Sequence, residues 1–257
     1  MKAVVTGMIG TCSVGGVAWD YGQYALGMEQ LGFETYYLED TGIPAHTWNE
    51  ATGEYEEDPS YGLDFLQRAL RELSPGLASH WHFHAYDDRT YGMSPEEVAD
   101  VCASADVLLN VSGCAVMRDS YRRCRRKVFI DTDPGWNHFV IFPRWDGKPR
   151  DVQQQGYRGH DWFFTFAQRH DRPDCLLPAL GLEWHPTRHP VVVDRWRPEP
   201  PGERWTTVMG WKTYPDGVEH NGLVYGSKEM EFPLIEAAPT RLAVPLEVAV
   251  NGDAPRQ

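Results

Sequence analysis

The chain has 257 residues, of which 42% are apolar and 24% charged, and its formal net charge at pH 7 is −13. This length accommodates one large or two modest domains, and the composition is typical of a globular protein. The negative charge argues against nucleic acid as the main partner, because phosphate binding needs a positive face. No apolar run approaches the ~18 residues of a transmembrane segment.

The sequence has five widely spaced cysteines and no CxxC motif. An odd, scattered set favours reduced thiols over a disulfide framework or a zinc site. The N-terminal stretch MKAVVTGMIG has too short an apolar run for a signal peptide. We therefore expect a cytoplasmic protein.

The first forty residues follow a strand–turn–helix–strand order. AVVTGMIG is an apolar run bounded by glycines, which is typical of a buried strand. From Gly16 to Leu31 apolar residues recur at steps of three and four, which predicts a helix, and Gly32 ends it. FETYYLED then predicts a second strand, and this βαβ order indicates a parallel sheet.

The same alternation continues downstream. Residues 41–60 have loop-like composition, and Ser60 is the predicted N-cap of the next helix. Ser94, Pro95 and Glu97 carry a capping-box pattern, which predicts the start of another helix. Further expected elements are strands in LASHWHFHA, VLLNVSG, KVFI and WFFTF, and a short basic helix around MRDSYRRCRR.

A linker interrupts the alternation. Residues 195–204 hold three prolines and a glycine, which cannot continue a helix or a central strand. We expect an α/β, doubly wound, mostly parallel Rossmann-like domain at 1–196, a Pro-rich linker at 197–204 and a second unit at 205–257. In the second unit, the sequence predicts strands in WTTVMGW and PLEVAVNG and a helix in EMEFPLIEAA. It is too short for a doubly wound domain, so we expect a truncated one.

The motif VFIDTDPG runs from an apolar strand into two aspartates. Ligands of parallel α/β sheets bind outside the carboxyl ends of the strands, so Asp131 and Asp133 are expected there. They could ligate a hard cation or act as acid–base groups. Alternatively, Asp133, Pro134 and Gly135 form only a tight turn. DTDPG also resembles the calcium loop of the nucleoside hydrolases, although Asn137 and His138 stand where that family has further aspartates.

The stretch TGMIGTCSVGG (6–16) is similar to the opening of the dinucleotide fingerprint TGxxGxxG, with Ser13 in place of the third glycine. The tyrosine–lysine pair of short-chain dehydrogenases has only an imperfect match, at Tyr225 and Lys228. Gly15 and Gly16 favour close approach of a ligand to a helix N-terminus. Alternatively, they serve only tight strand–helix packing.

Two aromatic-rich segments leave alternatives open. HWHFH puts His80, His82 and His84 on one face of a strand. They could bind zinc, face a cleft as a base or hydrogen-bond donor, or mark a partly exposed strand end. GLEWHPTRHPVVVDRW (181–196) suits a crossing segment between domains, where aromatic residues meet a ligand or pack in the core.

Several segments in order resemble bacterial GT-B glycosyltransferase-like proteins: GGVAWDYGQYALGMEQLGFETYYLED, VFIDTDPGW, DWFFTFAQ, GLEWHPTRHPVVVDRW and WTTVMGWKTY. The resemblance covers essentially the whole chain. It implies an N-terminal acceptor domain facing a C-terminal domain that binds a nucleotide sugar as co-substrate, with no cofactor and no metal. It implies a small-molecule or glycan acceptor. Because only the start of a donor domain is expected here, the chain is expected to be incomplete or inactive alone, with a donor half on a separate polypeptide.

The resemblance implies that a carboxylate or imidazole deprotonates an acceptor hydroxyl, which attacks the anomeric carbon of the sugar. The candidate bases are Asp133, Asp131, Asp20 and His82. The candidate substrate contacts are Gly15, Gly16, Trp19, Trp136 and His138. The alternatives are a non-catalytic binding domain with the same fold and a calcium-dependent hydrolase that uses DTDPG.

Overall fold

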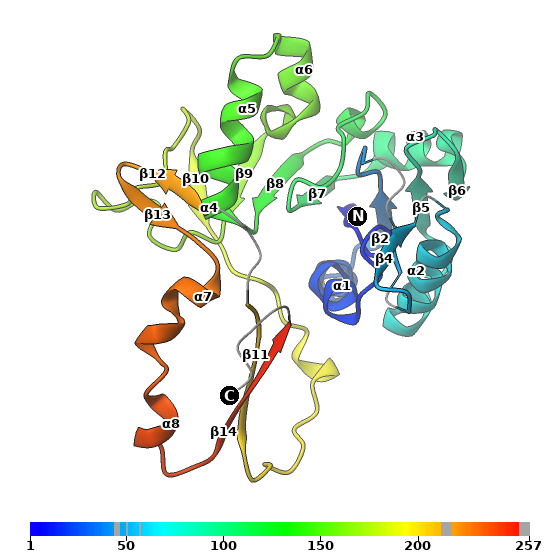
Figure 1. Ribbon diagram of the computed structural model, residues 1–257. Helices are drawn as coiled ribbons and strands as arrows, with labels where there is room; N and C mark the ends of the chain where they lie inside the picture. The colour runs from blue at the N-terminus through cyan, green and yellow to red at the C-terminus, as the bar shows by residue number, and fades with distance from the viewer. Residues whose placement is uncertain (44–46, 50, 57, 212–216, 252–257) are drawn as a thin grey trace. The chain divides into compact units, whose positions relative to one another are not determined.

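The computed structural model describes residues 1–43, 47–49, 51–56, 58–211 and 217–251. The chain forms two compact units, Met1–Val193 and Asp194–Gln257 (Figure 1). The first unit contains an eight-stranded sheet, and the second contains a parallel strand pair and a β-hairpin. Within the described residues, no helix combines the length and the apolar content needed to cross a membrane.

The sheet of the first unit has the order β10-β9-β8-β7-β1-β2-β5-β6. All neighbours pair in parallel except β5 and β6. This confirms the predicted α/β class and mostly parallel sheet, which is compatible with a Rossmann-like fold. The strands are β1 (Lys2–Thr6), β2 (Glu34–Glu39), β5 (Trp81–His84), β6 (Thr90–Gly92), β7 (Val107–Val111), β8 (Lys127–Asp131), β9 (Trp162–Thr165) and β10 (Trp184–Pro186).

The strand order reverses beside β1. The chain moves from β1 through β2 to β5 on one side, and then from β7 to β10 on the other. Ligands of open α/β sheets bind outside the carboxyl ends of strands where the order reverses. A ligand site is therefore expected at the loops that follow β1, β7 and β8.

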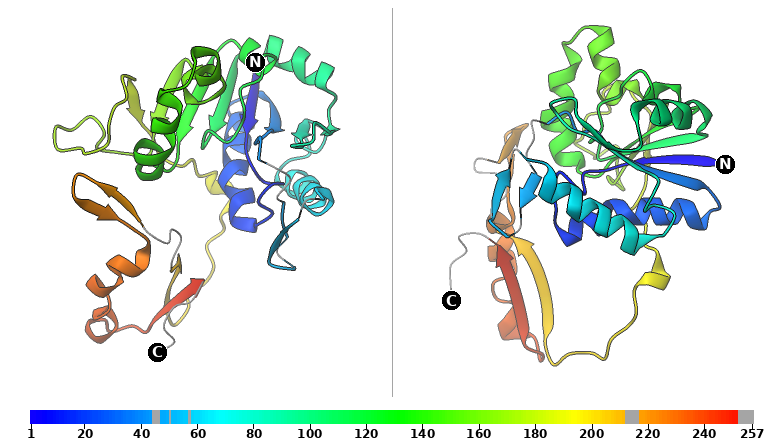
Figure 2. Two further views of the ribbon diagram at one scale, coloured as in Figure 1. Left: turned by 45° about the horizontal axis from the view of Figure 1, so that its top comes forward. Right: turned by 90° about the vertical axis from the view of Figure 1, so that its right-hand side faces the viewer.

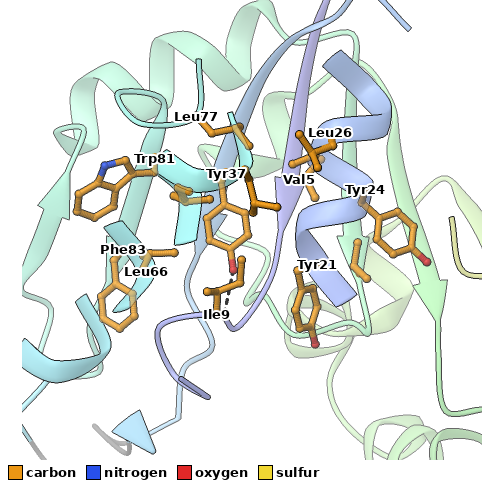
Figure 3. Packing of buried hydrophobic residues seen from close by; sticks show 14 of the residues in the cluster. Val5, Ile9, Tyr21, Tyr24, Leu26, Tyr37, Leu66, Leu77, Trp81 and Phe83 are labelled. Carbon is orange, nitrogen blue, oxygen red and sulfur yellow. Dashed lines mark hydrogen bonds between the residues drawn. The ribbon is translucent and has the colours of Figure 1, made fainter. Parts of the chain in front are cut away.

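Helices lie on both faces of this sheet, as a doubly wound arrangement requires. Helices α1 (Gly15–Gln30) and α2 (Ser60–Leu73) cover the face that includes Val5 and Tyr37 (Figures 2 and 3). Helix α3 (Pro95–Ser104) covers the face that includes Val4 and Leu38. The two faces use alternate residues because successive side chains of a strand point in opposite directions.

A third buried cluster supports β8, β9 and β10. Its members are all aromatic: Phe129, Phe142, Tyr157, Phe163 and Trp184. Strand β10 was not predicted, since its residues belong to a proline-punctuated segment. Pro186 is compatible with β10 because this strand lies at the edge of the sheet, where a missing N–H need not break a ladder.

Local capping predictions had mixed outcomes. The Ser94–Glu97 capping box is confirmed, with Ser94 accepting from the Glu97 amide and Glu97 from the Ser94 amide. Ser60 is not an N-cap: Pro59 occupies that position, and the Ser60 hydroxyl donates to Asp58 instead. The predicted basic helix is wrong, because only the 3-10 turn η1 (Tyr121–Arg123) forms there. The expected loop at 41–60 contains the strands β3 (Thr47–Asn49) and β4 (Glu54–Glu56).

The segment after Asp133 is helical, so the tight-turn alternative is wrong. Pro134 lies in the first turn, where its missing N–H is harmless. The helical run comprises α4 (Pro134–Trp136), a π-helical turn η2 (Asn137–Ile141) and α5 (Phe142–Asp146). Helix α6 (Arg150–Gln155) and the 3-10 turn η3 (Tyr157–Gly159) follow.

In the second unit, β11 (Trp205–Gly210) pairs in parallel with β14 (Leu246–Asn251). A hairpin of β12 (Val218–His220) and β13 (Leu223–Tyr225) lies between them in sequence. The helix predicted around 229–238 is instead α7 (Lys228–Glu231), the 3-10 turn η5 (Phe232–Leu234) and α8 (Ala238–Arg241). Pro233 and Pro239 account for the interruptions, because proline is tolerated only in the first turn of a helix.

Candidate functional site

The loop that joins β1 to α1 is held in place by Glu39, the last residue of β2. This carboxylate is fully buried, and its pKa is raised by burial. Its Oε1 accepts from the Thr11 amide (2.5 Å) and hydroxyl (2.6 Å), while Oε2 accepts from the Gly10 amide (2.9 Å) and the Tyr37 hydroxyl (3.1 Å). Dinucleotide-binding folds use an acidic residue near this position for the ribose. Because both Glu39 oxygens are engaged by the loop, the arrangement weighs against a dinucleotide ligand.

The glycines of the same loop separate into two kinds. A Cβ at Gly7 would lie 2.3 Å from the Tyr37 hydroxyl oxygen, so Gly7 is required for close packing. A Cβ at Gly15 or Gly16 would meet nothing within 4 Å. The packing alternative for Gly15 and Gly16 is therefore wrong. Both face open space at the N-terminus of α1, where Val14 supplies no side-chain cap.

A tight turn follows β7. Ser112 and Gly113 both have positive φ (59° and 60°), and the Cys114 amide donates to Val111 O at 3.3 Å. A positive φ at a serine stores backbone strain, which is maintained only when surrounding contacts fix it. The Ser112 hydroxyl lies 2.7 Å from the Thr132 hydroxyl of the loop after β8. Ser112 thus connects the loops after β7 and β8 at the carboxyl edge.

A pocket of about 250 Å³ opens beside this turn. The described residues that line it include no Asp, Glu, His, Lys or Arg, so the pocket carries no formal charge. Burial also raises the pKa of the Cys114 thiol to about 12, which keeps it protonated. The pocket therefore suits an uncharged ligand. Its walls are Thr41, Ser112, Gly113, Cys114, Ala115, Val116, Phe129, Asn137, Ile141, Phe142, Trp145, Gln155, Gly156 and Tyr157.

Asp131 and His138 lie together, but neither is exposed. Asp131 Oδ1 accepts from the Asn137 amide nitrogen (2.7 Å), and Oδ2 accepts from the Thr165 hydroxyl (2.8 Å) and from His138 Nε2 (3.1 Å). The other ring nitrogen of His138 donates to Pro178 O at 2.8 Å. His138 thus bridges the Asp131 carboxyl group and the backbone carbonyl of Pro178 within the core. The pair holds the helical segment after β8 against the sheet and presents no atom to a ligand.

Asp133 and Trp136 were predicted as a base and a sugar-stacking residue. The structure places Asp133 at the N-cap of α4 with an exposed side chain, and Trp136 half-buried in the first helical turn. Neither lines the pocket, whereas the next residue, Asn137, does. The π-helical turn begins at Asn137, and such turns occur frequently at functional sites.

Asp20, another predicted base, forms a pair with a residue that the sequence did not single out. Its Oδ1 lies 2.8 Å from His189 Nε2, and the two side chains are 40% and 32% exposed. Burial raises the pKa of Asp20, and the charge of His189 acts in the opposite direction. Burial is the main cause of the raised pKa of Tyr21 and of Cys114, and the charge of Asp20 makes a smaller contribution in the same direction.

His189 is fixed against α1 by its neighbours. Its ring stacks on Tyr24 with centroids 5.6 Å apart, and the Val192 amide donates to Gln23 Oε1 at 2.8 Å. Within the described part of the chain, the His189 Nδ1 atom and the Tyr24 hydroxyl are buried without a hydrogen-bond partner. Since Nδ1 is buried, the accessible group of the pair is the Asp20 carboxylate. Trp19, the predicted substrate contact before it, is partly buried against the core.

His82, the remaining predicted base, does not face a cleft. It is 2% exposed, its Nδ1 lies 2.6 Å from Met93 O, and burial lowers its pKa. His84 pairs with Asp88 at 3.0 Å, and His80 stacks on Tyr36. The three histidines thus have separate partners, which removes the basis for the zinc alternative. In the described ranges no group of three His, Cys, Asp or Glu side chains is arranged to hold a metal ion.

No protein-family model matches the sequence, and no curated protein is a significant match to it. The function is therefore inferred from the geometry of the site.

Proposed function

We propose that the first unit is the acceptor-binding wall of a GT-B-type glycosyltransferase, which transfers a sugar from a nucleotide sugar to a hydroxyl group. The observation that carries the proposal is the position of Ser112. This residue lines the uncharged pocket in the turn after β7, and β7 pairs with β1, whose following loop leads into α1 and Asp20. A binding pocket and an accessible base thereby share the carboxyl edge of the sheet, where α/β folds bind ligands.

The pocket has the chemistry that a sugar ring requires. Apolar ring faces pack on Trp145, Tyr157 and Phe142, while hydroxyl groups bond to Ser112 and Gln155. At about 250 Å³ the pocket is smaller than the 300–1,000 Å³ typical of drug-sized ligands, which favours one sugar residue. The absence of charge among its described walls favours a neutral acceptor over a phosphorylated or acidic one.

Asp20 is the proposed general base. A raised pKa improves a carboxylate as a proton acceptor, because basicity closer to the working pH increases the efficiency of proton transfer. The His189 ring holds one Asp20 oxygen and leaves the other for the acceptor. The acceptor hydroxyl gives its proton to Asp20, its oxygen bonds to the anomeric carbon, and the bond from that carbon to the nucleoside diphosphate breaks. The open amides at Gly15 and Gly16 are positioned to attract the anionic part of the nucleotide sugar.

The test has a binding arm and a turnover arm. Neutral monosaccharides and nucleotide sugars are screened by thermal unfolding, because a ligand at a hundred times its Kd stabilises a protein by roughly 2.7 kcal/mol. Release of nucleoside diphosphate is then measured with the monosaccharide and the nucleotide sugar that stabilise the protein most. Trp145→Ala should abolish monosaccharide binding, and Asp20→Asn should preserve it while lowering turnover by ~10²-fold or more. Matched controls are Trp162→Ala and Asp64→Asn, at exposed positions away from the pocket. Turnover that survives Asp20→Asn would remove Asp20 as the base, with exposed Asp133 next to be tested.

A second candidate function is favoured by one observation. No described residue in the pocket wall can exchange a proton near neutral pH, which is what a non-catalytic sugar-binding domain requires. That alternative predicts monosaccharide binding that depends on Trp145, with no release of nucleoside diphosphate from any donor. The calcium-dependent hydrolase is disfavoured because the Asp131 oxygens already accept three hydrogen bonds.

A further inference from the structure

The second unit contains a larger pocket, of about 540 Å³. One wall is a face of the parallel strand pair, with Leu246, Val248 and Val250 of β14 at alternate positions. The opposite wall comes from the segment of α7, η5 and α8, including Phe232. A volume in this range is typical of small-molecule sites.

One polar atom in this apolar pocket stands out. Glu229 lines the pocket, and its Oε2 atom is buried without a hydrogen-bond partner among the described residues. Burial of a carboxylate oxygen without a hydrogen-bond donor destabilises the folded state, so such an atom requires an explanation. A ligand that brings an N–H donor would supply one.

Two aromatic rings line the same pocket as Glu229. Trp211 and Phe232 both line the pocket, and their rings meet edge to face with centroids 5.1 Å apart. The Glu229 amide donates to Trp211 O at 3.2 Å, which places the acid next to this aromatic corner. Aromatic faces attract cations, and aromatic rings combined with a carboxylate are a recurring solution for ammonium recognition.

The charge of the lining agrees with a cationic ligand. Glu229 and Glu236 are both in the wall, and no lysine, arginine or histidine is among the wall residues that the structure describes. We propose that this pocket binds a small organic ammonium ion with an apolar body, such as an alkylamine or arylalkylamine. The ammonium group donates to Glu229 and lies against Trp211 and Phe232, while the apolar body packs on β14. This inference is independent of the sugar-transfer function of the first unit.

The experiment is calorimetric titration of the full chain with phenethylammonium and with its neutral counterpart 2-phenylethanol. We expect saturable binding of one amine per chain, and binding of the alcohol at least about tenfold weaker, since charge-assisted hydrogen bonds are roughly twice as strong as neutral ones. Methylammonium, which lacks the apolar body, should also bind more weakly. Equal affinities for amine and alcohol, or no amine binding at millimolar concentration, would overturn the proposal. This comparison uses the unaltered chain, so it does not depend on the folding of a variant.

A matched pair of variants locates the site. Glu229→Gln should weaken amine binding at least tenfold, whereas Glu231→Gln, an exposed position in the same short helix, should leave it unchanged. Trp145→Ala in the first unit should also leave it unchanged, which separates this site from the sugar pocket. Amine binding that is insensitive to Glu229→Gln would place the ligand elsewhere and contradict the assignment.

Discussion

The Asp131 carboxylate and the His138 imidazole lie 3.1 Å apart, and both side chains are fully buried. The DTDPG motif thus contributes its first aspartate to the scaffold and not to an ion-binding loop. This aspartate ends β8, Thr165 of neighbouring β9 donates to it, and Asn137 and His138 of the following helical segment do the same. The Asp131 carboxylate therefore positions Asn137, which lines the pocket of the first unit.

Replacement of this carboxylate should affect stability before it affects chemistry. Asp131→Asn replaces one acceptor oxygen with an N–H donor, so at least one buried hydrogen bond to Asn137, His138 or Thr165 is lost, at a cost of about 1–3 kcal/mol. Urea unfolding followed by circular dichroism measures the loss. Asp20→Asn is the control, because its pair with His189 is partly exposed and should contribute at most about 1 kcal/mol. A stable Asp131→Asn protein that had lost only activity would contradict the scaffold role.

Glu39→Gln should loosen the loop between β1 and α1. The glutamine amide keeps one acceptor but turns a donor toward groups that are themselves donors, so at least one buried hydrogen bond is lost. We expect a decrease in the free energy of unfolding of roughly 1–3 kcal/mol. Glu72→Gln, on the exposed face of α2, is the matched control and should be neutral. Equal stabilities of the two variants would show that the Glu39 contacts contribute little.

The two kinds of glycine in the loop should respond in opposite ways to alanine. Gly7→Ala forces a Cβ against the Tyr37 hydroxyl and should destabilise the fold by about 1–3 kcal/mol. Gly15→Ala meets no neighbour and should be neutral or stabilising by up to about 1 kcal/mol, because alanine favours the helix. Chemical denaturation of the two variants side by side measures both. A large destabilisation by Gly15→Ala would mean that the open space in front of α1 is not accessible.

The buried position of His160 should make the stability of the protein depend on pH. Its ring is buried, Nδ1 donates to Tyr157 O at 2.8 Å, and Nε2 accepts from the Asn110 amide at 3.1 Å, so the ring is neutral. Burial lowers its pKa from 6.5 to about 4. The unfolded chain then binds the proton more readily than the folded one. The stabilisation that the neutral His160 ring contributes to the folded state is fully present above pH 6.5. It is lost as the pH falls toward 4, which lowers the free energy of unfolding by roughly 3 kcal/mol in total.

The measurement for His160 is the free energy of unfolding at intervals between pH 4 and pH 7. His160→Gln removes the titrating ring and should flatten the part of the profile between pH 6.5 and pH 4, even if its overall stability is lower. His185→Gln, at a partly exposed ring, is the control and should keep the slope of the unaltered chain. A slope that persists in His160→Gln would assign the pH dependence to other groups.

Much of the fold followed from local patterns. Periodicity indicated β1, α1, β2 and β8, and the capping box at Ser94 marked the start of α3, because these signals depend on residues within one turn or one strand. Strand β10 escaped prediction because its three residues are stabilised by pairing with β9 and by the burial of Trp184, not by their own propensity. The broken helix of the second unit was predictable in principle from Pro233 and Pro239.

The sequence by itself determined the parallel α/β class, the loop glycines and the place of Asp131 at a strand end. Only the tertiary structure decided which of these residues face a ligand. Asp20 meets His189, Glu39 meets Thr11 and Ser112 meets Thr132 because strand order brings distant segments to one edge of the sheet. Burial then separates Asp131, which is enclosed by donors, from Asp20, which keeps access to solvent. Neither contact nor burial is encoded in the spacing of residues along the chain, since both arise from the packing of elements far apart in sequence.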